Sequence, residues 1–304
     1  MLEPCAPVAL GAEWSRGAFG SVHVVDTVGG RIAVKRVPDV PGHVNRELET
    51  CVRLASEPHP SIVRMLGYWH EGTGVHTTLF LVMEFVPETL CAVLARLEAS
   101  GMRMKTDRMS ALVSQLAGAL AHLERIRLVH RDVKPDNVLV DVRVDRLVLA
   151  DFGSAKFVEP GVPSATYVCT RYYRAPELIL DRDLYSTSVD VWAFGCVLGE
   201  FARGGPLFRG DTQVEVLASI IRTRGMVTAD DIAHMPAHRT EAGDVPVGPR
   251  VGPTPWSKVF TRRVGGRRVV TSYGAWYERA LDACLQWSPA KRISARALVL
   301  LLEK

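Results

Sequence analysis

The chain has 304 residues, of which 47% are hydrophobic and 23% are charged, and its formal net charge is +4. These values indicate a globular protein and exclude an intrinsically disordered or collagen-like chain. The longest apolar run near a terminus, Leu298–Leu302, is far shorter than the roughly 20 residues that span a bilayer, and no dense basic block occurs, so we expect neither membrane nor nucleic-acid partners.

The first ten residues lack the features of a secretory signal, because Met1–Leu10 contains Glu3 and two prolines instead of a basic region followed by an apolar stretch. We therefore expect the protein in the cytosol, the nucleus or both. The six cysteines are scattered without a C-x-x-C pair, which predicts reduced thiols and no structural metal.

The first part of the chain reads as β-structure with one helix. Valine-rich stretches at Ser21–Asp26 and Arg31–Val37 flank a Gly-Gly turn signal, which predicts a β-hairpin. Apolar residues near helical spacing predict a helix over 43–55. Two further strands are expected, at Ile62–Tyr68 and Thr77–Met83.

After Pro87 the pattern becomes helical. A small β-rich lobe, residues 1–85, and a larger helical lobe, residues 86–304, would together form one α+β domain, with a ligand cleft where Glu84–Glu88 joins them. Proline and glycine in Pro236–Pro255 predict a surface loop. The expected helices are Leu90–Glu98, Arg108–Arg125, Ser188–Phe201, Thr212–Arg224, Ala275–Gln286 and Ser294–Glu303.

A glycine-containing motif, SRGAFGSV at Ser15–Val22, lies between two strand-like stretches. Glycines let backbone N–H groups approach phosphate oxygens without obstruction by side chains, although a plain hairpin turn is the alternative. Lys35 follows in a valine-rich strand and could reach the same phosphates or be a solvated edge charge. Glu47, in the next helix, could hold Lys35 or be an ordinary surface charge.

Three short motifs follow later in the chain. Val129–Asn137 reads VHRDVKPDN and matches the catalytic-loop pattern H-R-D-x-x-x-x-N, in which Asp132 accepts the substrate hydroxyl proton. The triplet D-F-G begins at Asp151, fourteen residues after Asn137, and A-P-E follows at Ala175–Glu177. This order and spacing identify the chain as a member of the protein kinases.

The resemblance implies transfer of the γ-phosphate of ATP to a serine or threonine hydroxyl, a reaction that depends on positioning and charge neutralisation. Lys35 and Lys134 would supply positive charge, Glu47 would hold Lys35, and Asn137 and Asp151 would bind Mg²⁺. Because all these residues are present, we expect an active enzyme in preference to a kinase-fold scaffold.

Four segments narrow the resemblance: VPET at Val86–Thr89, DFGSAK at Asp151–Lys156, YVCTRYYRAPE at Tyr167–Glu177 and PWSKVF at Pro255–Phe260. They are similar to segments of the glycogen synthase kinase-3 family, and the similarity covers nearly the whole chain. Related cyclin-dependent kinases carry a different motif at Asn45–Leu48, and mitogen-activated kinases carry Thr-x-Tyr where this chain has Ala165 two residues before Tyr167. Both remain alternatives.

The same resemblance implies that adenine hydrogen-bonds to the backbone at Glu84 and Val86, with Met83 as the gatekeeper. Ser15 replaces the first glycine of the family's loop, which would alter nucleotide affinity without abolishing activity. Apolar members of the site could equally be core residues. The expected ATP-binding residues are Ser15, Gly17, Phe19, Gly20, Val22, Ala33, Lys35, Met83, Glu84, Val86 and Leu139.

Four further positions are assigned by the resemblance. Glu177 and Arg292 would form a buried ion pair that anchors the activation segment, and Asp190 would accept hydrogen bonds from the catalytic-loop backbone. Tyr167 would be phosphorylated, with the added charge bound by Arg171 and Arg174, whereas an unmodified loop tyrosine is the alternative.

Arg46, Arg131 and Lys156 each lie beside a catalytic motif, so folding should bring them together. In the family, such a pocket recognises a phosphate already present on the substrate, and arginine suits that role. Alternatively, Arg131 pairs with a phosphorylated activation segment and the other two are surface charges. The expected partners are protein substrates phosphorylated beforehand; scaffold proteins are possible, although the region after Gly210 diverges from the family.

Overall fold

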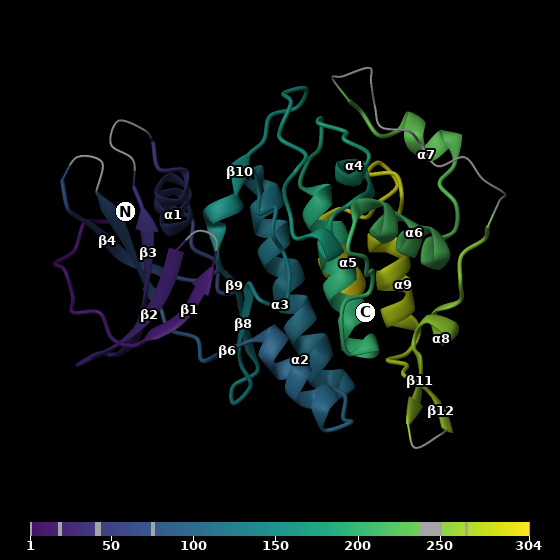
Figure 1. Ribbon diagram of the computed structural model, residues 1–304, viewed down its shortest axis with the longest axis horizontal. Helices are drawn as coiled ribbons and strands as arrows, with labels where there is room; N and C mark the ends of the chain where they lie inside the picture. Colours follow the sequence, from purple (N-terminus) through teal and green to yellow (C-terminus); the bar gives the residue numbers. More distant parts are fainter. Residues whose placement is uncertain are drawn as a thin grey trace.

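The computed structural model describes residues 2–17, 20–39, 44–73, 77–237, 251–264 and 267–303, arranged as two lobes (Figure 1). The small lobe is a five-stranded antiparallel sheet in the order β1-β2-β3-β5-β4, with helix α1 (Arg46–Ser56) on one face. The large lobe is mainly helical, which confirms the predicted α+β fold. The strands of the small lobe are β1 (Glu13–Gly17), β2 (Gly20–Thr27), β3 (Gly30–Pro38), β4 (Met65–Glu71) and β5 (Thr78–Glu84).

Alternation along β5 gives the small lobe two apolar faces. Leu79 and Leu81 pack in one cluster with Cys51 of α1. Phe80 and Val82 belong to a second cluster on the opposite face of the sheet. Because successive side chains of a strand point to opposite sides, this central strand supports both layers of the lobe.

Helix α5 (Ser188–Arg203) is the centre of the large lobe, because every residue from Val189 to Ala202 is buried. A helix that is apolar on all sides must be surrounded by protein. α3 (Thr106–Arg125) and α9 (Ala275–Cys284) pack against it. The remaining helices are α2 (Leu90–Ala99), α4 (Pro176–Ile179), α6 (Gln213–Arg224), α7 (Ala229–Ala233), α8 (Trp256–Val259) and α10 (Ala295–Leu302).

Short strands near the junction of the lobes position the predicted catalytic residues. β8 (Val138–Asp141) begins directly after Asn137, and Asp151 follows two residues after the end of β9 (Arg146–Leu149). The other short strands are β6 (Glu88–Thr89), which pairs with β8, β7 (Leu128–Val129), which pairs with β10 (Lys156–Phe157), and the hairpin β11 (Thr261–Val264) and β12 (Arg267–Val270).

Some predicted elements differ from the structure. The strand expected at Ile62–Tyr68 starts later, at Met65, because Ile62 instead bridges to Leu149 of β9. The hairpin of β11 and β12 falls where no strand was predicted. Of the predicted loop Pro236–Pro255, residues 238–250 lie outside the described residues.

The structure also bears on membrane spanning and on the state of the cysteines. No helix among the described residues is long and apolar enough to cross a membrane. The cysteines are all free thiols, as expected from their scatter, and Cys51, Cys196 and Cys284 are buried.

The predicted ion pair anchors the activation segment to the large lobe. Two guanidinium nitrogens of Arg292 lie 2.7 and 2.9 Å from the two carboxylate oxygens of Glu177, and both side chains are almost completely buried. Arg292→Met leaves that carboxylate buried without a counter-charge, so the free energy of unfolding, measured by urea denaturation, should fall by about 3–5 kcal/mol.

Arg96→Met is the matched control, because Arg96 pairs with Glu88 while 59% of its side chain is exposed. This variant should leave the urea midpoint nearly unchanged. An unchanged midpoint in Arg292→Met as well would show that the buried pair does not stabilise the lobe.

Candidate active site

A cavity of about 550 Å³ lies between the two lobes, a size that suits a nucleotide-sized ligand. Residues of the β-sheet, of the connection after β5 and of the large lobe form its wall. Phe19 lies outside the described residues. Every other predicted ATP-binding residue lines the cavity, namely Ser15, Gly17, Gly20, Val22, Ala33, Lys35, Met83, Glu84, Val86 and Leu139.

The glycine motif forms the junction of β1 and β2, which pair as far as Gly17 opposite Gly20. Gly20 has a φ of +143°, and a Cβ there would lie 1.9 Å from the carbonyl oxygen of Arg36, so no other residue fits. Ser15 pairs with Val22 and lines the cavity. A serine at this position is therefore compatible with the pairing of β1 with β2, which has an irregularity between Glu13 and Ser15.

Lys35, on β3, lies between two carboxylates. Its Nζ is 2.5 Å from Oε1 of Glu47 and 2.8 Å from Oδ1 of Asp151. Asn45 caps α1 by accepting the backbone N–H groups of Glu47 and Leu48, which fixes the helical turn that carries Glu47. Burial by itself lowers the pKa of Lys35, but the two carboxylates outweigh it and raise that pKa above its ordinary value. Lys35 therefore remains a cation.

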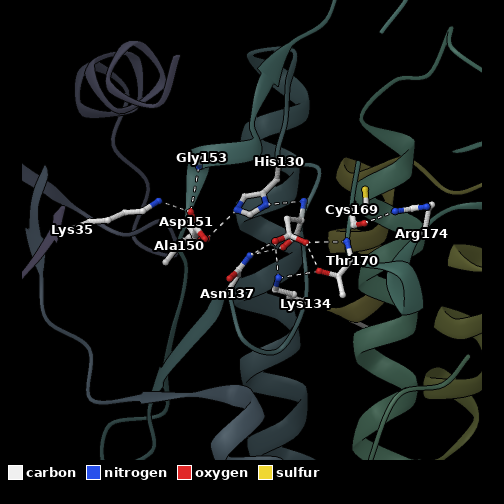
Figure 2. A network of polar contacts seen from close by, with 11 residues as sticks. Lys35, His130, Lys134, Asn137, Ala150, Asp151, Gly153, Cys169, Thr170 and Arg174 are labelled. Carbon is white, nitrogen blue, oxygen red and sulfur yellow. Dashed lines mark hydrogen bonds and ion pairs between the residues drawn. The ribbon is translucent and has the colours of Figure 1, made fainter. Parts of the chain in front are cut away.

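Lys134, Asn137 and Thr170, which are labelled in Figure 2, hold the carboxylate of Asp132. Oδ1 accepts the hydroxyl of Thr170 at 2.7 Å and its backbone N–H at 3.1 Å. Oδ2 accepts Nζ of Lys134 at 2.7 Å and Nδ2 of Asn137 at 2.9 Å. Burial raises the pKa of Asp132, but hydrogen bonds from Lys134 and Thr170 outweigh it and hold the pKa below its ordinary value. Asp132 is therefore an ionised proton acceptor at neutral pH.

The backbone of the catalytic loop is fixed to the core of the large lobe. Asp190 of α5 accepts the N–H groups of His130, at 2.7 Å, and Arg131, at 2.9 Å, which confirms the predicted contact. Arg131 has a left-handed backbone with a φ of 65°, a conformation that non-glycine residues adopt only when their surroundings enforce it. The His130 ring also contacts the carbonyl oxygen of Ala150 at 3.0 Å. These contacts hold the loop that carries Asp132.

The structure brings Arg46, Arg131 and Lys156 together. Burial, then the charges of Arg131 and Arg46, lower the pKa of Lys156. Arg131 donates to the carbonyl oxygen of Ser154 at 2.6 Å, and Lys156 donates to the hydroxyl of Ser164 at 2.8 Å. Within the described parts of the chain, no carboxylate lies at ion-pair distance from any of the three cations.

Tyr167 is 77% exposed, as a modifiable loop residue must be. The guanidinium of Arg174 lies 4.7 Å from the centre of its ring. Arg174 is itself buried and donates to the carbonyl oxygens of Val168 and Cys169, whereas Arg171 binds a carbonyl oxygen just before α6. Of the two arginines considered as phosphate partners, Arg174 is the one that contacts this tyrosine.

Several residues that line the cavity were not predicted from the sequence, and Thr170 and Trp14 are two of them. Thr170 contacts Asp132 and Lys134 but stands in the activation segment, far from the catalytic loop in sequence. Trp14 of β1 lines the cavity, and its ring meets the ring of Phe85 edge-on at 5.4 Å. An aromatic residue directly before the glycine motif was the available signal for Trp14.

Asn137 and Asp151 line the cavity and offer the oxygen ligands that Mg²⁺ prefers. Glu47 and Asp151 share a single ammonium, that of Lys35, so this end of the cavity has one negative charge to spare when all three groups are ionised. Among the described residues, no group of three or more histidine, cysteine, aspartate or glutamate side chains could hold a metal. Mg²⁺ shared with nucleotide phosphates needs only one or two carboxylates, so the residues present fit that ion.

Comparisons with known proteins agree with this geometry. Residues 11–300 match the protein kinase domain family. A curated protein called Glycogen synthase kinase 3, from Trypanosoma brucei brucei, is 35% identical over 253 residues, which cover 81% of this chain and 70% of that protein. The kinase match includes every residue of the site described above. The chain therefore belongs to the glycogen synthase kinase 3 family of eukaryotic protein kinases, and it is a serine/threonine kinase that uses ATP and Mg²⁺.

Proposed function

We propose that this kinase phosphorylates serine or threonine residues of proteins that already carry a phosphate nearby. The observation that carries the proposal is the group formed by Arg46, Arg131 and Lys156, which has no carboxylate partner among the described residues. Like charges repel, so the arrangement is unfavourable until an anion binds. Arginine binds phosphate through two parallel hydrogen bonds, which favours a phosphorylated side chain over a simple carboxylate surface.

The phosphate transfer itself follows from the charges in the cavity. Lys35 is a buried cation that binds phosphate oxygens of ATP. When bound, Mg²⁺ neutralises phosphate charge, and Asn137 and Asp151 are the residues that would hold it. Asp132 orients the substrate hydroxyl and accepts its proton as the hydroxyl oxygen bonds to the γ-phosphorus and the bond from that phosphorus to the leaving ADP breaks. Lys134, 2.7 Å from Asp132, places positive charge beside the same reacting group.

A competing role for the three cations is to bind a phosphate on the activation segment of the same chain. Tyr167 is exposed, and its ring lies against the guanidinium of Arg174, which is not one of the three cations. This arrangement favours an external phosphate for the cation group. The two roles are distinguished by comparing a peptide that already carries a phosphate, called primed below, with an unphosphorylated, or unprimed, peptide of the same sequence.

Arg46→Ala should lower kcat/KM for a primed peptide by about 5- to 150-fold, which corresponds to the loss of about 1–3 kcal/mol of charge-assisted contact. The unprimed peptide should be phosphorylated at nearly the same rate as by the wild type. Arg53→Ala, on the same helix but in its last turn, is the matched control and should change neither rate. Equal losses on both peptides would show that Arg46 supports α1 instead of binding the priming phosphate.

Thr170→Val should move the acid limb of the kcat profile to higher pH. The pKa of Asp132 is held below its ordinary value in part by the Thr170 hydroxyl, so losing that donor raises the pKa. The ionised form is needed, and activity is therefore lost at a higher pH as the solution is acidified. Thr170→Ser keeps the hydroxyl and should keep the wild-type profile. An acid limb that stays in place in Thr170→Val would contradict the role given to this hydroxyl.

Active protein purified after expression should carry phosphate on Tyr167, as read by mass spectrometry. A phosphate adds about −2 charge, and the nearby Arg174 guanidinium offers a partner for it. The inactive variant Asp132→Asn, expressed in the same way, should be bare at Tyr167 if the chain modifies itself. Fully active protein without phosphate at this position would remove the proposal.

A further inference from the structure

Residues Leu2–Ala12, called the N-terminal strap below, wrap around the sheet of the small lobe, where Figure 1 draws the purple start of the chain. One end is fixed to β2, because the N–H of Val24 donates to the carbonyl oxygen of Ala12 at 3.2 Å. The other end is fixed to the edge strand β4, where the N–H of Cys5 donates to the carbonyl oxygen of Tyr68 at 2.9 Å. The strap therefore covers an edge that would otherwise expose unpaired backbone groups.

The strap contacts both faces of the sheet. Cys5 and Val8 pack against the cluster on the face away from α1. Leu2 lies beyond the bridge between Pro4 and Tyr68, is 8% exposed, and belongs to the cluster on the α1 face. The chain thus crosses the edge of β4 between Leu2 and Cys5.

Close packing fixes this crossing. A Cβ at Gly67 of β4 would lie 2.9 Å from Sγ of Cys5 and 3.3 Å from the carbonyl oxygen of Glu3. Real Cβ atoms are essentially never found at the first of these distances and seldom at the second, so a residue larger than glycine at position 67 requires Cys5 or the strap backbone to shift.

Leu2 shares its cluster with residues that matter for catalysis. Cys51 of α1 is buried in this cluster and stands four residues after Glu47, one turn along the same helical face. Leu81 belongs to the cluster and the gatekeeper Met83 packs against it, and both residues line the nucleotide cavity. Leu2 therefore packs behind the helix whose Glu47 holds Lys35.

We propose that Leu2 is a positioning residue for phosphoryl transfer, because it wedges the N-terminal strap behind α1 and keeps Glu47 on Lys35. α1 packs on only one face of the sheet, so its position depends on a few apolar contacts. Without the Leu2 side chain, α1 moves outward for part of the time, Lys35 loses one of its two carboxylates, and the phosphates of ATP are held in a less productive position.

Steady-state kinetics test the proposal. Leu2→Ala should lower kcat by about five- to tenfold. KM for ATP should change by less than about twofold, because Glu84 and Val86, whose backbone is expected to bind adenine, lie outside the cluster. Leu2→Met, which restores apolar volume, should recover kcat. Val8→Ala is the matched control, since Val8 belongs to the same strap but packs on the other face; it should lower Tm without lowering kcat.

A second test is thiol labelling of the folded protein, in which mass spectrometry measures the labelling rate of each cysteine. Cys51 is 3% exposed, so its labelling is slow until α1 separates from the strap. Leu2→Ala and Gly67→Val should each speed labelling of Cys51 and leave that of Cys284 unchanged, whereas Val8→Ala should affect neither. If Leu2→Ala and Val8→Ala lower Tm alike, with kcat and Cys51 labelling unchanged in both, the strap only covers the sheet and the proposal is wrong.

Discussion

The buried contact of Lys35 with Glu47 and Asp151 is the interaction on which the active site depends. Its three side chains come from β3, from α1 and from the second residue after β9, so one ammonium links both lobes. Burying ions costs several kcal/mol each unless their partners are placed well. The arrangement is therefore stable only when α1 lies against the sheet, and the position of α1 decides whether ATP phosphates meet a correctly held cation.

The two halves of the site are held in place by different means. The catalytic loop depends on Asp190, a side chain inside the fully buried helix α5, so Asp132 belongs to the rigid core of the large lobe. Glu47 instead depends on a helix that is covered on one face, capped by Asn45 and backed by a short apolar cluster. Contacts with low local stability are the ones that ligands and modifications can shift. Control of this kinase should therefore act on α1 more readily than on the catalytic loop.

Residues in contiguous motifs could be predicted from the sequence, because their chemistry and spacing are local. Lys35, Asp132 and Asp151 lie where those motifs imply, and the two-lobed α+β fold is confirmed. Thr170 could not be found in this way, since its contact with Asp132 exists only after the activation segment folds back. The strap was missed for another reason: its backbone forms only isolated contacts with β2 and β4, so no apolar periodicity marks it. Residues 62–64 were assigned to a strand because a valine and an isoleucine suit any buried extended segment.

The cations of the site differ in whether they have a counter-charge, and this difference indicates what each can bind. Lys35 and Lys134 each touch a carboxylate, so their charge orders protein groups before any ligand arrives. The side chains of Arg46, Arg131 and Lys156 form no ion pair with a carboxylate among the described residues, and burial, then the charges of Arg131 and Arg46, lower the pKa of Lys156. An ion already paired gains little from a new anion, whereas an unpaired group gains the full attraction and is relieved of repulsion. Under the proposed function, selectivity for a phosphorylated partner would therefore follow from the cations whose side chains folding leaves without a counter-charge, rather than from the number of basic residues near the site.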